Sequence, residues 1–276
     1  MTKIALTIAG VDPSGGAGTI ADVKTFAAFG VFPTAAIASI TFQNTQGVFG
    51  AEHQSAESIR EQIIPILDDY EVAAVKTGML PTREVIEVVA AIIAERELKN
   101  IVVDPVVRST SGFDLIDDAA LRSLIEKLFP LADIITPNIP EAERISGVAI
   151  ETEADIHDAA SVMRDLGARN VLIKGGHMGN AEGGMPNAES SEDAGKRVAK
   201  DFLFLESELK VFEGEYFDTM ATHGTGCTLS SAIAANLALG NDLVSSVEIA
   251  KRFVNEAIRT APMIGRGHSP INIKPI

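Results

Sequence analysis

Short apolar runs alternate with amphipathic segments along most of the chain, and this alternation limits the fold more than any other feature. Apolar runs indicate buried strands, whereas apolar residues that recur at helical spacing indicate helices packed on a sheet. The predicted strands are 4–8, 34–40, 73–76, 101–104, 133–136 and 171–174, and the predicted helices are 16–29, 58–67, 83–95, 119–128 and 156–166. This repetition predicts an α/β fold with a mostly parallel central sheet, covered by helices on both faces because its strands are apolar throughout.

The last third of the chain has a different pattern. Residues 175–199 are rich in Gly, Asn, Glu and Ser and have no periodicity, so we interpret the region around 177–200 as a flexible loop or lid. Two apolar segments, 202–205 and 209–212, are spaced for a hairpin, and two helices are predicted at 226–239 and 243–257. The loop has no linker character, so we predict a single domain over residues 1–276.

Charge and cysteine content exclude several classes of protein. The formal net charge is −15, and such an acidic chain repels nucleic acid and anionic membranes, so we expect neither as a partner. No stretch approaches the roughly 18 uninterrupted apolar residues of a membrane span. Cys227 is the single cysteine, which excludes an internal disulfide, and the first ten residues lack the apolar core of a signal peptide. We therefore predict a cytoplasmic protein.

The most informative motif is HGTGCT, residues 223–228, which opens an Ala-rich apolar helix. Gly224 and Gly226 let the backbone approach a ligand closely, and the N-terminus of a helix favours phosphate. Cys227 falls in the first turn, where the pKa of a thiol is usually lowered, so a thiolate that acts as a base is predicted. The alternative is a glycine turn into a buried helix, with cysteine as a small apolar residue. The spacing alone does not decide between these interpretations.

A second glycine-rich turn, GVDPSGGAG at residues 10–18, lies between a predicted strand and a predicted helix. It does not satisfy the dinucleotide-binding pattern Gly-x-Gly-x-x-Gly, because Ala21 stands where the third glycine is needed after Gly16 and Gly18. Its place at the C-terminal end of a strand is where open α/β sheets bind ligands. A turn with a purely structural role is the alternative.

Polar residues also follow the other predicted strands. Asp104 and Glu141 carry hard oxygen ligands that suit the Mg²⁺ of a bound nucleotide, although Glu141 would equally complement a helix N-terminus. Lys174 would meet phosphate or be a solvated lysine beside a turn, and Met79 would line the site or pack in the core. Because the C-terminal ends of parallel strands share one edge, these turns together predict one active site there.

Seven segments, in this order and over most of the chain, resemble a known family. They are LTIAGVDPSGGAGTIADVKTF (6–26), FQNTQGV (42–48), VKTGML (75–80), VVDPV (102–106), TPNIPEA (136–142), IKGGH (173–177) and HGTGCTLSSAIAA (223–235). The chain is similar to the hydroxymethylpyrimidine and hydroxymethylpyrimidine-phosphate kinases of thiamine biosynthesis, within the ribokinase-like superfamily. The resemblance implies a three-layer α/β/α fold, ATP and Mg²⁺ as cofactors, a small pyrimidine as substrate, and a homodimer.

The resemblance also implies roles for individual residues. Cys227 would be the base toward the substrate hydroxyl, and backbone N–H groups of Gly224, Thr225 and Gly226 would form an anion hole for the transferred phosphoryl group, a step that depends mainly on positioning and charge neutralisation. The pyrimidine would lie against Gln43, with Gly10, Asp12, Met79 and Val106 around it. The nucleotide side would be formed by Asn138, Lys174 and Gly176, with Lys174 also assisting catalysis, and Asp104 and Glu141 would face the metal.

Two segments depart from the family pattern. After Val106 the family usually has Met, a small residue and Lys before Ser-Gly, whereas this chain has VRSTSG at 107–112, in which Arg108 would compensate for the lysine. The region 175–199 is also longer than usual.

Two other functions remain open at this point. Pyridoxal or pyridoxine kinases share the cysteine motif, although the amide of Gln43 both donates and accepts and so suits an aminopyrimidine edge better. A non-catalytic ligand sensor would also keep the pocket. ATP turnover in the presence of substrate would separate these possibilities.

Overall fold

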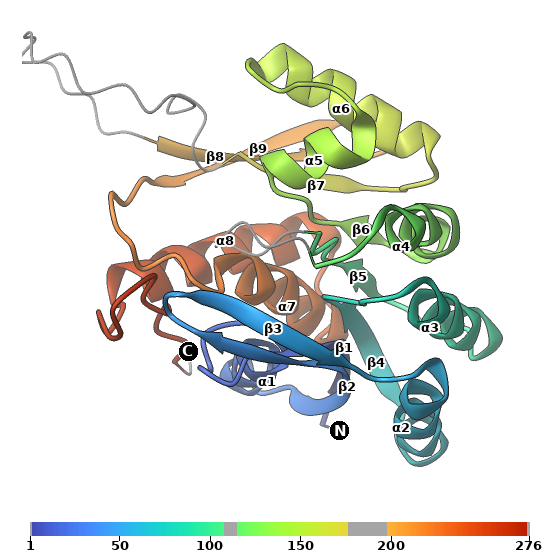
Figure 1. Ribbon diagram of the computed structural model, residues 1–276. Helices are drawn as coiled ribbons and strands as arrows, with labels where there is room; N and C mark the ends of the chain where they lie inside the picture. The colour runs from blue at the N-terminus through green and yellow to red at the C-terminus, as the bar shows by residue number, and fades with distance from the viewer. Residues whose placement is uncertain (1, 108–114, 176–197, 275–276) are drawn as a thin grey trace, which may run out of the picture.

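The computed structural model describes residues 2–107, 115–175 and 198–274, and its strands form one nine-stranded sheet (Figure 1). The spatial order of the strands is β3-β2-β1-β4-β5-β6-β7-β8-β9. The strands are β1 (Ile4–Val11), β2 (Phe32–Asn44), β3 (Gly47–His53), β4 (Val72–Thr77), β5 (Ile101–Val103), β6 (Ile134–Ile135), β7 (Val171–Lys174), β8 (Val198–Phe204) and β9 (Leu209–Glu215). Neighbours from β2 to β7 are parallel, and β3, β8 and β9 pair antiparallel at the two edges. The predicted mostly parallel sheet is confirmed.

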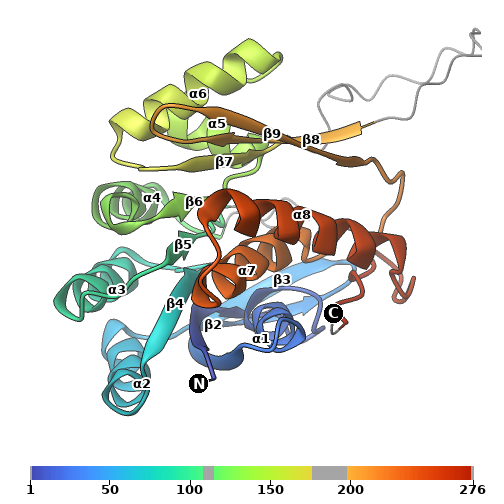
Figure 2. The same ribbon diagram turned by 180° about the vertical axis from the view of Figure 1, so that it is seen from behind.

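Helices cover both faces of this sheet, which gives the predicted three layers (Figures 1 and 2). The helices are α1 (Gly18–Ala28), α2 (Ala56–Asp69), α3 (Arg83–Glu95), α4 (Asp118–Ser123), α5 (Ile139–Ser146), α6 (Glu153–Asp165), α7 (Thr225–Ala238) and α8 (Leu243–Arg259). The buried side chains of α1, α7 and α8 pack in one cluster, and those of α2 to α6 pack in another. None of the described helices is long and apolar enough to cross a membrane.

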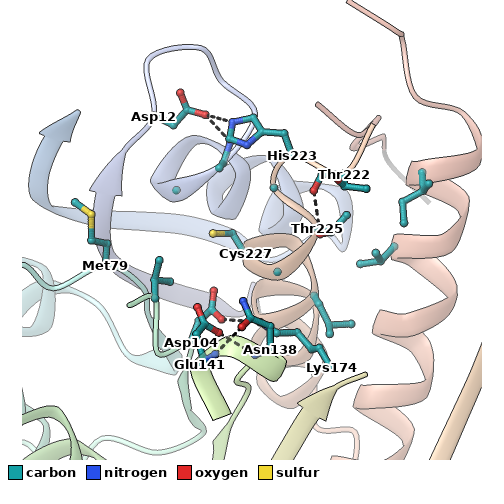
Figure 3. A pocket seen from close by; sticks show the side chains of 18 of the residues that line it. Asp12, Met79, Asp104, Asn138, Glu141, Lys174, Thr222, His223, Thr225 and Cys227 are labelled. Carbon is teal, nitrogen blue, oxygen red and sulfur yellow. Dashed lines mark hydrogen bonds and ion pairs between the residues drawn. The ribbon is translucent and has the colours of Figure 1, made fainter. Parts of the chain in front are cut away.

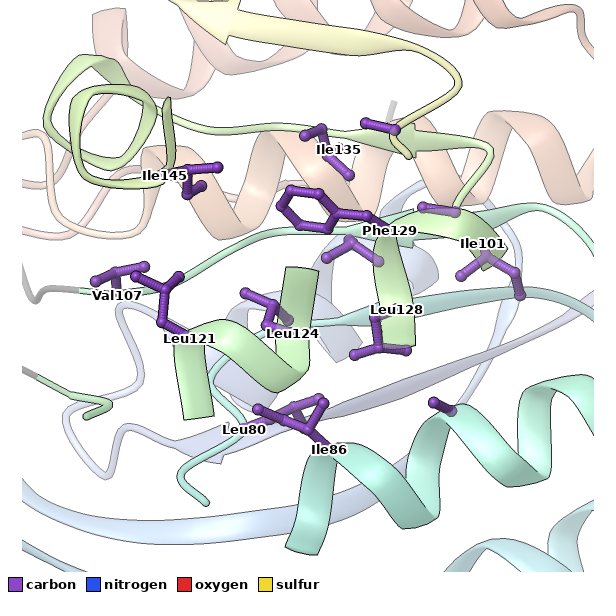
Figure 4. Packing of buried hydrophobic residues seen from close by; sticks show 14 of the residues in the cluster. Leu80, Ile86, Ile101, Val107, Leu121, Leu124, Leu128, Phe129, Ile135 and Ile145 are labelled. Carbon is purple, nitrogen blue, oxygen red and sulfur yellow. The ribbon is translucent and has the colours of Figure 1, made fainter. Parts of the chain in front are cut away.

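The two clusters exist because successive side chains of a strand point to opposite faces of the sheet. In β1, Leu6 and Ile8 join the larger cluster, whereas Ala5 joins the smaller one. Figure 4 shows part of the larger cluster, where Phe129 lies among aliphatic side chains that include Ile135 and Leu128. A sheet that is buried on both faces accounts for strands that are apolar throughout.

The predicted helix 119–128 is confirmed in part. The α-helix α4 passes into a π-helical turn, Leu124–Leu128, in which the Phe129 N–H donates to the Leu124 carbonyl. A short 3-10 turn, Phe129–Leu131, follows. Pro130 has no N–H and cannot continue an α-helical ladder, so the segment ends there.

The edges of the sheet differ most from the prediction. β2 extends to Asn44 and pairs with β3, which the sequence pattern did not predict because this edge hairpin is only partly buried and mixes polar with apolar residues. β8 begins at Val198, so the predicted loop around 177–200 is wrong at its end, and residues 176–197 lie outside the described residues. The hairpin predicted over 202–212 is confirmed as β8 and β9, whose strands are longer than expected.

Candidate active site

A cavity of about 350 Å³ opens at the C-terminal edge of the parallel strands (Figure 3). Its walls come from the turns after β1, β4, β5 and β6, the end of β7, and the N-terminus of α7, as expected where parallel strands end together. The predicted site residues that line it are Gly10, Asp12, Gln43, Met79, Asp104, Val106, Asn138, Glu141, Lys174, Gly224, Thr225, Gly226 and Cys227. Gly176 and Arg108 lie outside the described residues.

The start of α7 is held against the glycine-rich turn after β1. Gly224 has a φ of +88°, and a Cβ there would overlap the backbone carbonyl oxygen of Gly16. Only glycine therefore allows this contact. The first turn of α7 has no side-chain cap and no acidic residue, so its partial positive charge faces the cavity without competition. The Thr225 N–H already donates to the Thr222 carbonyl at 3.3 Å, so fewer of the predicted backbone N–H groups are free to bind an anion.

Cys227 lies in this first turn, between the two ends of the cavity (Figure 3). Loss of hydration raises the pKa of its thiol to about 12, Lys76 opposes the increase, and Asp104 and Asp22 add to it. The predicted lowering of the thiol pKa is therefore wrong. The helix N-terminus favours the thiolate, but removal from water and two nearby carboxylates outweigh it.

On one side of Cys227, Asp104 and Lys174 form an ion pair, with 3.1 Å between Oδ1 and Nζ. Burial alone raises the pKa of Asp104, but Lys174 and Lys76 outweigh it and hold that pKa below its ordinary value. Burial raises the pKa of Glu141 to about 7; Lys174 opposes this, and the charge of Asp104 adds to it. The two buried carboxylates therefore differ: the lysines keep Asp104 charged, whereas the pKa of Glu141 lies close to neutral pH.

Glu141 also has the structural role that the sequence left open. Its Oε2 accepts from the Asn138 N–H at 2.8 Å, and the Asn138 Oδ1 accepts from the Glu141 N–H at 2.9 Å, which is a capping box at the start of α5. The pair therefore fixes the start of α5 at the cavity wall, and both side chains are held in place there.

The carboxylates fit the Mg²⁺ that a nucleotide carries. The described residues hold no group of three or more His, Cys, Asp and Glu side chains able to bind a metal. Mg²⁺ bound with a nucleotide needs only one or two protein carboxylates, because phosphates and water complete its octahedron. Asp104 and Glu141, with more negative charge than Lys174 neutralises, supply that donor set.

On the other side of Cys227, Asp12 and His223 form a buried pair, with 2.7 Å between Oδ2 and Nε2. Asp12 also accepts from the N–H groups of Ser14 and Ala17, at 2.8 and 3.0 Å. Burial raises the pKa of Asp12, but its hydrogen bonds to His223 and Ser14 outweigh this and lower it overall. Asp12 thus shapes the turn and orients His223, a residue of the HGTGCT motif to which the sequence alone assigned no role.

Gln43 lies beside this pair, with its Nε2 3.4 Å from the His223 Nε2. A single ring nitrogen cannot both donate to Asp12 and accept from Gln43, and the short contact with a carboxylate is the stronger. The Thr41 hydroxyl lies 3.0 Å from the Gln43 carbonyl oxygen and 2.8 Å from the Val11 carbonyl oxygen, and its single hydrogen is shared between these two acceptors. The amide N–H groups of Gln43 are therefore available to a ligand in the cavity.

Met79 and Gly10 lie close together at the Gln43 end of the cavity. A Cβ on Gly10 would come within 2.6 Å of the Met79 Cε, so the missing side chain makes room for the thioether. Val106, which is partly exposed, completes the apolar wall. An apolar slot with a few polar groups at one end is typical of sites that bind small molecules.

The part of the cavity that β8, β9 and α8 form, called its far end below, was not predicted from the sequence. Asp201 and Lys251 form a buried ion pair there at 2.6 Å, and Asn255 lies nearby. Lys251 interrupts the apolar face of α8, which is the one signal that would have pointed to it.

The matching family model, described as phosphomethylpyrimidine kinase, covers residues 12–272 of the chain. The chain belongs to this family. A hydroxymethylpyrimidine/phosphomethylpyrimidine kinase of Staphylococcus aureus (strain MRSA252) is 40% identical over 271 residues, which cover 98% of this chain and 93% of that protein.

Solved structures agree with this assignment. A crystal structure of phosphomethylpyrimidine kinase from Clostridium difficile 630 has a TM-score of 0.77 at 39% identity and covers 93% of this chain and 100% of that one. The ADP complex of Bacillus subtilis pyridoxal kinase has a TM-score of 0.84 at 36% identity, with coverage of 99% and 97%. The chain is therefore a kinase with the ribokinase-like fold, and its family membership supports ATP as the phosphoryl donor.

Proposed function

We propose that this protein transfers the γ-phosphoryl group of ATP to 4-amino-5-hydroxymethyl-2-methylpyrimidine and to its monophosphate, in thiamine biosynthesis. The observation that carries the proposal is one cavity with two ends, a ring slot beside Gln43 and a group of charged residues around Lys174, which meet at the start of α7. The family assignment and the relatives at about 40% identity support the same reaction.

In the proposed reaction, the pyrimidine ring lies between Met79 and Val106, and the Gln43 amide donates to a ring nitrogen. The hydroxymethyl group then faces Cys227 and the first turn of α7. The free N–H groups of that turn stabilise the phosphoryl group as its charge spreads over three oxygens. Lys174 neutralises charge on the nucleotide phosphates from the opposite wall.

We propose that Asp104 and Glu141 hold the Mg²⁺ of the nucleotide. The metal would neutralise phosphate charge and orient the phosphates. The donor set supports this assignment, since two carboxylates lie on the nucleotide side of Cys227 and only one lysine pairs with them.

Phosphorylation of pyridoxal is the second candidate, because a pyridoxal kinase is among the close structural neighbours. The two substrates differ at the ring edge that Gln43 faces, since an aminopyrimidine offers a ring acceptor and an amino donor there. Gln43 therefore favours the pyrimidine.

The test is coupled ADP release at saturating Mg–ATP, with hydroxymethylpyrimidine, its monophosphate and pyridoxal measured side by side. We expect turnover on both pyrimidines and little on pyridoxal. In Gln43→Leu, which keeps the side-chain volume, kcat/KM should fall at least tenfold for the pyrimidines and change little for pyridoxal. Turnover mainly on pyridoxal would replace the proposal with the second candidate, and turnover on none of the three would overturn both.

We also propose that the protein is cytoplasmic and forms a homodimer. The lone cysteine supports a reducing compartment. Large apolar side chains exposed on the β2–β3 hairpin, Ile40, Phe42 and Phe49, support self-association. Sedimentation velocity should give twice the mass of one chain, and Phe49→Ser should shift the equilibrium toward monomer.

A further inference from the structure

A buried ion pair lies outside the residues assigned so far. The Nζ of Lys76, on β4, is 3.1 and 2.9 Å from the two carboxylate oxygens of Asp22, on α1. Both side chains are fully buried. Asp22 also accepts from the Thr7 hydroxyl at 2.6 Å and from the Ser231 hydroxyl at 2.7 Å. The Asp22 carboxylate therefore accepts four hydrogen bonds, two from Lys76 and one each from Thr7 and Ser231, and this arrangement fixes the position of the Lys76 ammonium group.

Stability alone is a weak reason for such a pair. Replacing a buried ion pair with apolar side chains of similar volume is often neutral or stabilising, because both charges lose their hydration. The four residues before Lys76 in this strand are apolar, so an apolar residue at position 76 would suit the packing around it. The position of the charge within the molecule is therefore the more informative feature.

The pair lies behind the first turn of α7. Ser231, which donates to Asp22, follows Cys227 by four residues, so the two side chains lie on the same face of the helix. Lys76 itself lines the active-site cavity. A Cβ on Gly78 would lie 2.8 Å from the Lys76 Nζ, so glycine leaves room beside the ammonium group.

We propose that Lys76, fixed by Asp22 and Ser231, is a positioning residue that sets the electrostatic environment of Cys227. This inference rests on the proposed function only for its effect on turnover. Its effect on the thiol does not depend on which substrate the protein uses.

The charged groups that interact with Cys227 come from four elements. Lys76 lies on β4, Asp22 on α1, Asp104 after β5 and Lys174 at the end of β7. Lost hydration raises the pKa of Cys227, both carboxylates raise it further, and Lys76 is the side chain that most opposes them. Removing the Lys76 charge should raise the pKa of the thiol again and lower its reactivity.

The direct test measures the thiol without turnover. Cys227 is the single cysteine, so iodoacetamide alkylation in the folded protein reports on it alone. In Lys76→Met, alkylation between pH 8 and 10 should slow about three- to fourfold for each unit of pKa increase, because a tenfold smaller thiolate fraction is partly offset by greater nucleophilicity. The value of kcat/KM for the pyrimidine at pH 8 should fall at least tenfold, with KM for ATP within about twofold of the unmodified protein's.

A second variant separates this effect from folding. Lys76→Met alone leaves the Asp22 carboxylate buried and unpaired, which destabilises strongly. The double variant Asp22→Asn/Lys76→Met has neither charge, so it should fold, and its melting temperature checks that. If Lys76 only supports the fold, the double variant recovers the original alkylation rate, and the proposal is overturned. Loss of Asp22 lowers the pKa of Cys227, but Lys76 has the larger effect on it. If Lys76 positions charge for Cys227, alkylation in the double variant is therefore slower than in the unmodified protein and faster than in Lys76→Met.

A matched control uses the other buried ion pair of the cavity. Lys251→Met removes a similarly buried lysine whose partner is Asp201, at the far end. Alkylation of Cys227 should not change in this variant, and an equal slowing there would overturn the specific role of Lys76. Loss of ADP release in the unmodified protein, with the alkylation results intact, would count against the proposed function alone.

Discussion

Replacing Cys227 with alanine tests whether a thiol that is hard to ionise acts as the catalytic base of this site. With a pKa of about 12, roughly one thiol in 10⁵ is ionised at pH 7. If the thiolate takes the proton of the substrate hydroxyl, kcat/KM reports on this ionisation, because that constant follows the free enzyme. We therefore expect kcat/KM for the pyrimidine to rise about tenfold per pH unit between pH 7 and 9.

Cys227→Ala should remove this slope and lower kcat/KM by about 10²- to 10⁴-fold at pH 8, the usual contribution of a general base. That loss equals about 2.7 to 5.5 kcal/mol of transition-state stabilisation. The assay is coupled ADP release at saturating Mg–ATP across the pH range. Cys227→Ser is the control, because it keeps a hydrogen-bond acceptor of similar size whose hydroxyl does not ionise in this range.

Two results would refute the reasoning. A flat pH profile in the unmodified protein, together with nearly full activity in Cys227→Ala, would leave Cys227 as a part of the cavity wall. Full activity in Cys227→Ser would show that accepting a hydrogen bond is sufficient and that no thiolate is needed.

Three further predictions follow from contacts in the cavity. Glu141, whose pKa is raised to about 7, must lose its proton to bind a metal, so Mg–nucleotide affinity should increase as the pH rises through 7. Calorimetry in two buffers of different ionisation enthalpy should detect proton release on binding, and Glu141→Gln should abolish that release. Equal proton release in the unmodified protein and in Glu141→Gln would contradict this prediction. Gly224→Ala should cost several kcal/mol more than Gly240→Ala in chemical denaturation and should abolish activity, because both have positive φ but only Gly224 faces a backbone carbonyl. Gly10→Ala should raise KM for the pyrimidine at least tenfold at similar melting temperature, since Met79 is flexible and must move into the ring slot; an unchanged KM would show that the ring lies elsewhere.

Much of the fold could be predicted from the chain because local pattern and burial agree. The central strands β1, β5, β6 and β7 are mainly apolar and buried, and α3 was predicted with its observed bounds. The edge strand β3 could not be predicted, since its polar and apolar residues show no clear alternation and the strand depends on pairing with β2.

The candidate site was predictable to a similar extent. Turns that follow parallel strands must share one edge, so Asp12, Asp104 and Lys174 were expected to be neighbours before any distance was known. The sequence did not indicate the partners of these residues. His223 lies 211 positions from Asp12, and Lys76 lies 54 from Asp22, so only the folded chain shows these pairs.

The sequence by itself determined the layers, the family and the edge of the sheet that carries the site, because periodicity, glycine turns and motif order are properties of the chain. Only the tertiary structure decided the ionisation of that site. The position of Cys227 at a helix N-terminus favours a low thiol pKa, whereas the protein atoms packed around it reduce its hydration and two carboxylates lie near, which raises the pKa to about 12. The thiol pKa depends on the hydration of Cys227 and on charges from α1, β4 and the turn after β5. Because these segments are far apart in the sequence, no local sequence pattern predicts their combined effect.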